Sequence, residues 1–274
     1  MQAPFTDVLV PLDGSPTAEL ALGPALVVVR RTGVPLRVVT AALPGDEGSF
    51  DTYLSDIAKR HADVTAIETR VVTADGAAEA IAAEMLPRTL VCMSSHGRGG
   101  LSRALVGSVA ETLLRTIVDP ALIVGPDLAE GPLLEGRIVA CLDGSDESER
   151  TLGPAKEWSE VLGLPLWLMQ VGEPGSPADW SSGGDVHEGG HLAVTAARLG
   201  GVSGWDALHG RDPARALVDM ASSHVEDTAM LVMATHGRTG WDRLRLGSVT
   251  AGTVREATVP VLVVPAGPRP APED

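Results

Sequence analysis

Short apolar runs alternate with longer amphipathic stretches along the whole chain, and this pattern predicts strands that alternate with helices. The first apolar run, at 8–12, ends in Asp-Gly-Ser, which is typical of a buried strand followed by a turn. The first half therefore predicts strands at 8–12, 36–42, 65–73, 89–93 and 121–124, and helices at 16–32, 49–63, 77–86 and 108–117. Such alternation favours a largely parallel sheet covered by helices on both faces.

The second half repeats the pattern. It predicts strands at 137–142, 166–171, 204–208, 229–233 and 261–264, and helices at 148–161, 190–199, 214–224 and 248–255. Residues 126–136 are rich in Pro, Gly, Asp and Glu, so we place the join between two domains there. The predicted organisation is one domain at 1–130, a second at 136–266 and a disordered tail at 267–274.

Sequence landmarks confirm that the second half repeats the first. Asp13-Gly14-Ser15 recurs 130 residues later as Asp143-Gly144-Ser145, and Gly107 recurs 140 residues later as Gly247. A fixed order of landmarks that occurs twice predicts two similar domains. We expect the ten extra residues of the second half in the Gly/Ser/Asp-rich stretch 172–190.

One loop with candidate binding chemistry occurs in both halves. Nine residues separate Gly97 from Gly107-Ser108, and nine separate Gly237 from Gly247-Ser248. Glycine lets backbone N–H groups approach an anion closely, and a helix start adds free N–H donors and the positive end of the helix dipole. Two such elements that face one point would form a cradle for a polyphosphate.

Composition narrows the function classes. The net charge is −15 and 3% of residues are aromatic, which argues against nucleic-acid binding. Acidity does not exclude a small anion, because local backbone dipoles hold it. We expect no signal peptide and no membrane-spanning helix, because the first residues carry no basic cluster and no apolar run reaches membrane-spanning length. Cys92 and Cys141 fall in predicted strands, so we expect a reducing, cytoplasmic location.

With Asp-Gly-Ser after the first strand, His-Gly-x9-Gly-Ser before the last helix and Pro-x-Leu-x-Val at the end, each half resembles a universal stress protein domain. The chain is similar to the tandem type found in actinobacteria. The resemblance implies two five-stranded parallel α/β sandwich domains, Rossmann-like and related to the adenine nucleotide alpha hydrolases. It also implies an ATP-binding regulator of stress response or growth arrest, with ATP, alone or together with Mg, as the ligand.

The resemblance assigns binding residues in both halves. The aspartate contacts adenine or ribose, the end of the second strand forms an apolar wall for the base, His-Gly lines the ribose and phosphates, and Gly-Ser-Val holds the phosphates. The implied ATP-binding residues are Asp13, Ala41, Ser94, His96, Gly97, Gly100, Gly107, Ser108, Val109, Asp143, Val171, Ala234, His236, Gly237, Gly240, Gly247, Ser248, Val249 and Thr250. We expect one ATP per domain; if only one site binds, Val171 offers the larger apolar wall.

One motif position departs from the family. Nucleotide-binding members carry Gly-x2-Gly-x9-Gly-Ser/Thr, and Ser94 and Ala234 stand at the leading glycine. If that position needs φ > 0, a Cβ costs on the order of 1 kcal/mol; if φ is negative, Ser and Ala are tolerated. Both side chains are small, so we expect binding to survive.

Other functions stay open at this stage. Asp13, His96 and Ser108 together suggest a Ser-His-Asp hydrolase, but no G-x-S-x-G elbow is present, and no P-loop motif is present either. We expect no catalytic residues and no metal site. The alternatives to ATP binding are a domain pair that acts through protein contacts alone and a slow ATPase.

The last strand of each half leads to a prediction about architecture. Residues 121–124 and 261–264 are short apolar runs, and an exposed apolar edge strand invites pairing. By the family resemblance, we expect these strands to pair antiparallel within the chain, with Pro126 and Pro265 ending the pairing. Two chains are then expected to form a homodimer.

Overall fold

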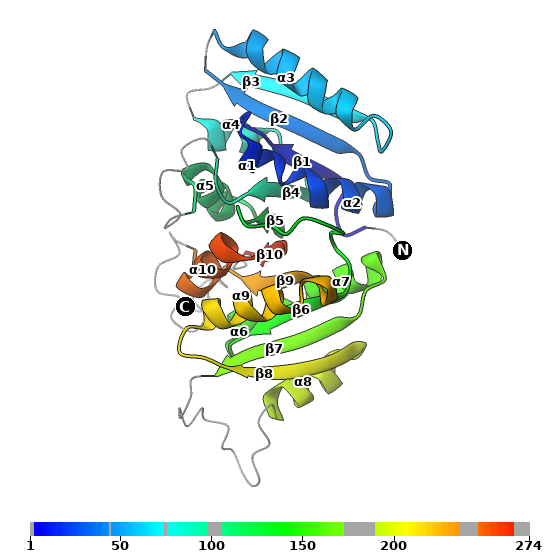
Figure 1. Ribbon diagram of the computed structural model, residues 1–274, viewed down its shortest axis with the longest axis vertical. Helices are drawn as coiled ribbons and strands as arrows, with labels where there is room; N and C mark the ends of the chain where they lie inside the picture. The colour runs from blue at the N-terminus through cyan, green and yellow to red at the C-terminus, as the bar shows by residue number, and fades with distance from the viewer. Residues whose placement is uncertain are drawn as a thin grey trace, which may run out of the picture.

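The computed structural model describes residues 3–43, 45–73, 76–97, 106–172, 190–235 and 246–265. Strands and helices alternate through both halves, as the sequence predicts (Figure 1). The elements of the first half are β1 (Asp7–Pro11), α1 (Pro16–Glu19), α2 (Leu22–Thr32), β2 (Leu36–Ala42), α3 (Glu47–Arg60), β3 (Ile67–Thr73), α4 (Ala77–Ala83), β4 (Thr89–Ser94), α5 (Ser108–Thr116) and β5 (Ala121–Val124).

The second half contains the same series of elements, with one added 3-10 turn. Its elements are β6 (Arg137–Leu142), α6 (Asp146–Glu149), α7 (Leu152–Leu162), β7 (Leu166–Gly172), α8 (Gly190–Leu199), β8 (Val202–His209), α9 (Pro213–Ser223), η1 (Val225–Asp227), β9 (Thr228–Ala234), α10 (Ser248–Glu256) and β10 (Val261–Val264). Each half thus contributes five strands to an α/β fold.

All ten strands join one sheet in the order β3-β2-β1-β4-β5-β10-β9-β6-β7-β8. Neighbouring strands within a half are parallel, and the two halves meet where β5 pairs antiparallel with β10 (Figure 1). Leu122 lies opposite Leu262 at the centre of this pairing. The predicted antiparallel pairing of the two terminal strands is confirmed.

One predicted helix is broken in each half. The sequence predicts a continuous helix at 16–32, but the structure divides it into α1 and α2, and the second half divides likewise into α6 and α7. Pro24 lacks an N–H group, so the Leu20 carbonyl loses its partner four residues ahead; Pro154 has the same effect on Arg150. Two prolines that follow glycine in the sequence therefore set both breaks.

The extra residues of the second half lie in more than one place. Val72 pairs with Ala41 and Leu208 with Val171, so the later part of β8 lies 136 positions after β3 while β7 lies 130 after β2. Leu166 pairs with Val202, 135 positions after Ile67, so five extra residues precede β8. The other five lie between Val202 and Met230: one at the register shift in β8, and four after it, in the stretch that contains α9 and η1. The expectation that all of them lie in 172–190 is wrong for these five.

Apolar side chains fill both faces of the shared sheet, and each layer runs through both halves. One layer contains residues of α2, α3, α7 and α8, and the other contains residues of α4, α5, α9 and α10. The join between the halves packs into this core: Leu134 is buried, and Gly136 (φ 87°) lies against the Asp227 backbone. Phe5 of the first half lies 5.4 Å, between ring centroids, from Trp158 of the second.

Within the described ranges, no helix has the length and apolar character needed to cross a bilayer.

Candidate nucleotide site

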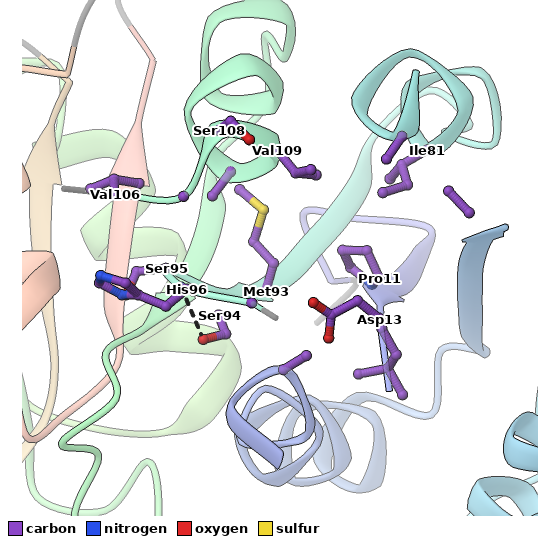
Figure 2. A pocket seen from close by; sticks show the side chains of 17 residues that line it. Pro11, Asp13, Ile81, Met93, Ser94, Ser95, His96, Val106, Ser108 and Val109 are labelled. Atoms are coloured by element: carbon purple, nitrogen blue, oxygen red, sulfur yellow. Dashed lines mark hydrogen bonds between the residues drawn. The ribbon is translucent and has the colours of Figure 1, made fainter. Parts of the chain in front are cut away.

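A cavity of about 400 Å³ opens at the carboxyl ends of the first-half strands, between β1, β4, α4 and α5. Ligands of open parallel α/β sheets bind at this edge. The lining residues are Pro11, Leu12, Asp13, Ala18, Ala41, Ala77, Ile81, Met93, Ser94, Ser95, His96, Gly97, Val106, Gly107, Ser108, Val109 and Ala110 (Figure 2). Every first-half site residue that the sequence predicts lines this cavity, except Gly100, which lies outside the described residues.

Asp13 begins a tight turn that also caps α1. Its Oδ1 accepts hydrogen bonds from the Ser15 N–H at 2.9 Å and the Ser15 hydroxyl at 2.6 Å, and Ser15 Oγ accepts from the Ala18 N–H at 3.2 Å. Gly14 has φ 83°, a conformation that favours glycine. One carboxylate oxygen of Asp13 therefore holds the turn, and Figure 2 shows the carboxylate facing the cavity.

The second half builds the same turn. Asp143 Oδ1 accepts from the Ser145 N–H at 2.9 Å and the Ser145 hydroxyl at 2.5 Å, and Gly144 has φ 81°. The capping role of Asp-Gly-Ser is thus present in both halves.

Gly97 lies against Asp13. A Cβ at Gly97 would overlap Asp13 Oδ2, so no side chain fits there unless the aspartate moves. The absence of a side chain lets the loop after β4 approach the end of β1, which closes one wall of the cavity.

The family's leading glycine is not needed for backbone conformation in this chain. Ser94 ends β4 and Ala234 ends β9, and neither has a positive φ. The Ser94 hydroxyl accepts a hydrogen bond from the His96 N–H at 3.3 Å. Of the two cases that the sequence left open, negative φ applies, and both replacements are tolerated.

His96 does not form a catalytic triad. Its Nδ1 lies 2.9 Å from the Ser95 hydroxyl, and its Nε2 is buried without a hydrogen-bond partner in the described part of the chain. In Figure 2 the ring points away from the space that Asp13 faces. Since Asp13 Oδ1 is engaged by Ser15, the hydrolase arrangement of aspartate, histidine and Ser108 is absent from this site.

The N-terminus of α5 lies at the cavity, where Gly107, Ser108 and Val109 line it. Gly107 is the N-cap residue with φ −60°, and no side chain caps the helix. The Gly107 N–H donates to the Ser95 carbonyl at 2.7 Å, so it is not free to bind a ligand. The N–H groups of Ser108, Val109 and Ala110 form the first turn of the helix and have no intrahelical acceptor, and none of the described residues provides one.

Close packing explains the glycine at 107. A Cβ there would lie 3.2 Å from the Ser95 carbonyl oxygen, which is tighter than ordinary contact. The second half repeats this arrangement, because the Gly247 N–H donates to the Thr235 carbonyl at 2.7 Å and Gly247 is the N-cap of α10. Ser248 and Val249 follow in its first turn, and the Thr250 hydroxyl donates to the Ala234 carbonyl at 2.7 Å.

Three predicted residues of the second half lie outside the described residues: His236, Gly237 and Gly240. Of the described residues, Asp143 follows β6, Val171 is the next-to-last residue of β7, Ala234 ends β9 and Gly247 precedes α10. Their first-half counterparts hold the same places relative to β1, β2, β4 and α5.

Sequence reasoning missed the wall that α4 provides. Ala77 and Ile81 line the cavity, as do Met93 and Ala110. A 3.6-residue apolar period marks Ile81 as inward-facing, but the sequence does not reveal which strand ends α4 covers.

Metal and thiol chemistry find no support in the described ranges. No group of three His, Cys, Asp or Glu side chains there could hold a metal ion. Burial raises the pKa of the Cys141 thiol to about 12 and raises the pKa of the Cys92 thiol as well. Both cysteines therefore act as small apolar core residues.

The fold defines a five-stranded parallel α/β domain that occurs twice in the chain, and in the first half a cavity lies at the carboxyl ends of its strands. The family model of the Universal stress protein family matches residues 4–125 and 136–265. The chain therefore belongs to the universal stress protein family, in its tandem form.

Curated relatives agree with this membership. The chain is 35% identical over 197 residues to Universal stress protein Rv2005c of Mycobacterium tuberculosis, with 64% of this chain and 61% of that protein covered. A universal stress protein of Mycolicibacterium smegmatis is 29% identical over 195 residues, with the same shares covered. The match thus spans less than two thirds of these relatives' length.

Two solved structures share the fold. A universal stress protein from Archaeoglobus fulgidus DSM 4304 superposes with a TM-score of 0.71 at 21% identity, covering 97% of this chain and 100% of that chain. A protein from Pseudomonas aeruginosa PAO1 superposes with a TM-score of 0.68 at 16% identity, covering 95% and 92%.

Proposed function

We propose that this universal stress protein binds ATP in the first-domain cavity and that occupancy of the site serves as a signal to other components of the cell. The observation that carries the proposal is one cavity that joins an apolar slot to an uncapped helix N-terminus. A nucleotide has the same two ends, an aromatic base and an anionic phosphate chain.

The apolar end suits the base. Ala41, Ile81, Met93 and Val109 line it, and Asp13 lies at its edge, where a carboxylate oxygen can accept hydrogen bonds from ribose hydroxyls or a base amine. Burial of a flat ring between aliphatic side chains supplies hydrophobic free energy in proportion to the area covered.

The polar end suits the phosphates. Ser108, Val109 and Ala110 of the first turn of α5 line the cavity, and the helix dipole favours negative charge there. A Mg²⁺ ion would be held mainly by the phosphates and water, because Mg²⁺ keeps several waters in such sites.

Rapid hydrolysis does not fit these residues. Asp13 Oδ1 is engaged in its turn and His96 Nδ1 is engaged by Ser95, so neither atom is placed to activate water. We therefore propose a binding protein rather than an enzyme, within a cytoplasmic, homodimeric assembly that acts through protein contacts.

Isothermal titration of the full chain with ATP and Mg²⁺ tests the proposal, and mass spectrometry of ligand released from the purified protein gives an independent readout. We expect binding in the micromolar range or an adenine nucleotide that co-purifies. If millimolar ATP produces no heat and no nucleotide is released, a protein-contact role without nucleotide replaces the proposal. If bound ATP is converted to ADP within minutes, the slow ATPase alternative gains support.

A further inference from the structure

We propose that the two domains are not equivalent in binding: the first domain admits a purine base, and larger side chains in the second domain exclude it. The proposal rests on the function proposed above, and it reverses the preference for the Val171 side that the sequence alone suggested. Three separate features of the described residues support it.

The first feature is the wall at the end of the second strand of each domain. Ala41, the sixth residue of β2, lines the first-domain cavity, and Val171 is the sixth residue of β7. Val171 Cγ1 lies 3.9 Å from the place of a Cβ on Gly210, in the turn before α9. Val171 thus occupies space between the strand end and that turn, where Ala41 leaves room.

The second feature is the pair of helices that flank the site. Ala77 begins α4 and lines the cavity, whereas Pro213 begins α9. Ala110 is the third residue of α5, whereas Thr250 is the third residue of α10. The Thr250 hydroxyl reaches the Ala234 carbonyl at 2.7 Å and so crosses the gap between helix and strand.

The third feature is the distance between those helices. A Cβ on Gly252 of α10 would lie 2.8 Å from Ala214 Cβ of α9. The backbone of α10 at Gly252 therefore packs directly against the Ala214 methyl group of α9. The corresponding residue of α5 is Thr112, whose side chain needs space. The second-domain helices are therefore free to pack closer over the site than their counterparts in the first domain.

These differences act in the same direction. Ala-to-Val, Ala-to-Pro and Ala-to-Thr exchanges each add two heavy atoms at positions that line the first-domain cavity, and a rigid purine cannot change shape to avoid them. Adding volume to a packed contact costs enough free energy to weaken binding about tenfold to a hundredfold. The second domain keeps the Gly247 helix start but lines the place of the base with bulkier side chains.

Titration of the full chain with ATP and Mg²⁺ provides the test. We expect a stoichiometry of one per chain, and we expect the double variant Ala41→Val/Ala110→Thr to weaken binding at least tenfold. Ala83→Thr on α4 and Ala207→Val on β8 are matched control variants outside the cavity, and circular dichroism reports folding. A stoichiometry of two, or one site of unchanged affinity in the double variant, would overturn the inference but leave ATP binding intact.

A second measurement needs no variant. Photolabelling of the wild-type chain with 8-azido-ATP, followed by peptide mapping, should place the label in residues 3–125. A label divided equally between the two domains contradicts the inference, whereas no binding and no label would remove the proposed function itself.

Discussion

At the start of its first strand, each domain pairs a side chain with one on the second strand, but the first domain forms an ion pair there and the second a cation–π contact. In the first domain Asp7 on β1 forms an ion pair with Arg37 on β2 at 2.5 Å and accepts from the Thr89 hydroxyl at 2.7 Å. In the second domain the corresponding residues are Arg137 and Trp167, and the guanidinium lies 4.8 Å from the ring centroid. The fold therefore needs two complementary side chains at this place but does not specify their chemistry.

The exchange extends to a third strand. A Cβ on Gly204 of β8 would overlap the Trp167 ring, so this glycine makes room for the indole against the sheet. In the first domain Arg37 instead donates to the Glu84 carbonyl at 2.8 Å. The exchange of Arg37 for Trp167 between the domains is thus accompanied by different contacts on neighbouring elements. Coordinated exchanges of this kind allow the two domains to differ while the fold stays the same.

The largest expected effect concerns the β5–β10 pairing, through which the two domains stabilise one another despite their different sites. Val263 is fully buried opposite Ala121 in the β5–β10 pairing. Val263→Lys would bury an unpaired charge, which costs several kcal/mol, so we expect the halves to separate or the chain to aggregate. Size-exclusion chromatography and urea unfolding measure this, with Val194→Lys on an exposed position of α8 as the control. Unchanged stability in Val263→Lys would contradict the shared sheet.

The next effect concerns the phosphate end of the first domain. Gly107→Glu places a Cβ 3.2 Å from the Ser95 carbonyl and a carboxylate beside the phosphates. Like charges repel strongly at such distances, so we expect ATP affinity to fall at least a hundredfold. Gly107→Ala, which adds the Cβ without the charge, should lose much less. Equal affinity of Gly107→Glu and wild type in the titration would place the phosphates elsewhere.

The strands and the edge of the cavity could be predicted from the sequence, whereas the hydrogen bonds inside the site depend on contacts that only the fold creates. Apolar runs located all ten strands, and the duplicated Asp-Gly-Ser and Gly-Ser landmarks located the cavity edge, because both signals are local. The helix breaks were missed although Pro24 was visible, since the apolar period continued through it. The engaged N–H of Gly107 could not be foreseen, because its acceptor Ser95 is placed by the end of β4.

An intermediate effect separates the two chemistries at the domain starts. Asp7→Ala leaves Arg37, whose side chain is 14% exposed, without its carboxylate, and removal of one partner from a buried pair costs about 3 kcal/mol. Arg137→Ala removes a cation–π contact worth about 1 kcal/mol. Urea unfolding at neutral pH should show the larger loss for Asp7→Ala. If the two variants lose equal stability, the ion pair and the stacked pair are energetically interchangeable.

The smallest effect examines the helix spacing that distinguishes the two sites. Gly252→Ala would force Cβ atoms to 2.8 Å between α10 and α9, and overpacking of this kind costs about 1–3 kcal/mol, although alanine is the better helix former. Thr112→Ala, at the corresponding position of α5, removes atoms from a half-buried position and should cost less than about 1 kcal/mol. Thermal unfolding of both variants measures the difference. If Gly252→Ala is more stable than wild type, helix propensity outweighs packing, and α9 and α10 have room to separate. The second domain would then be able to open a slot like that of the first.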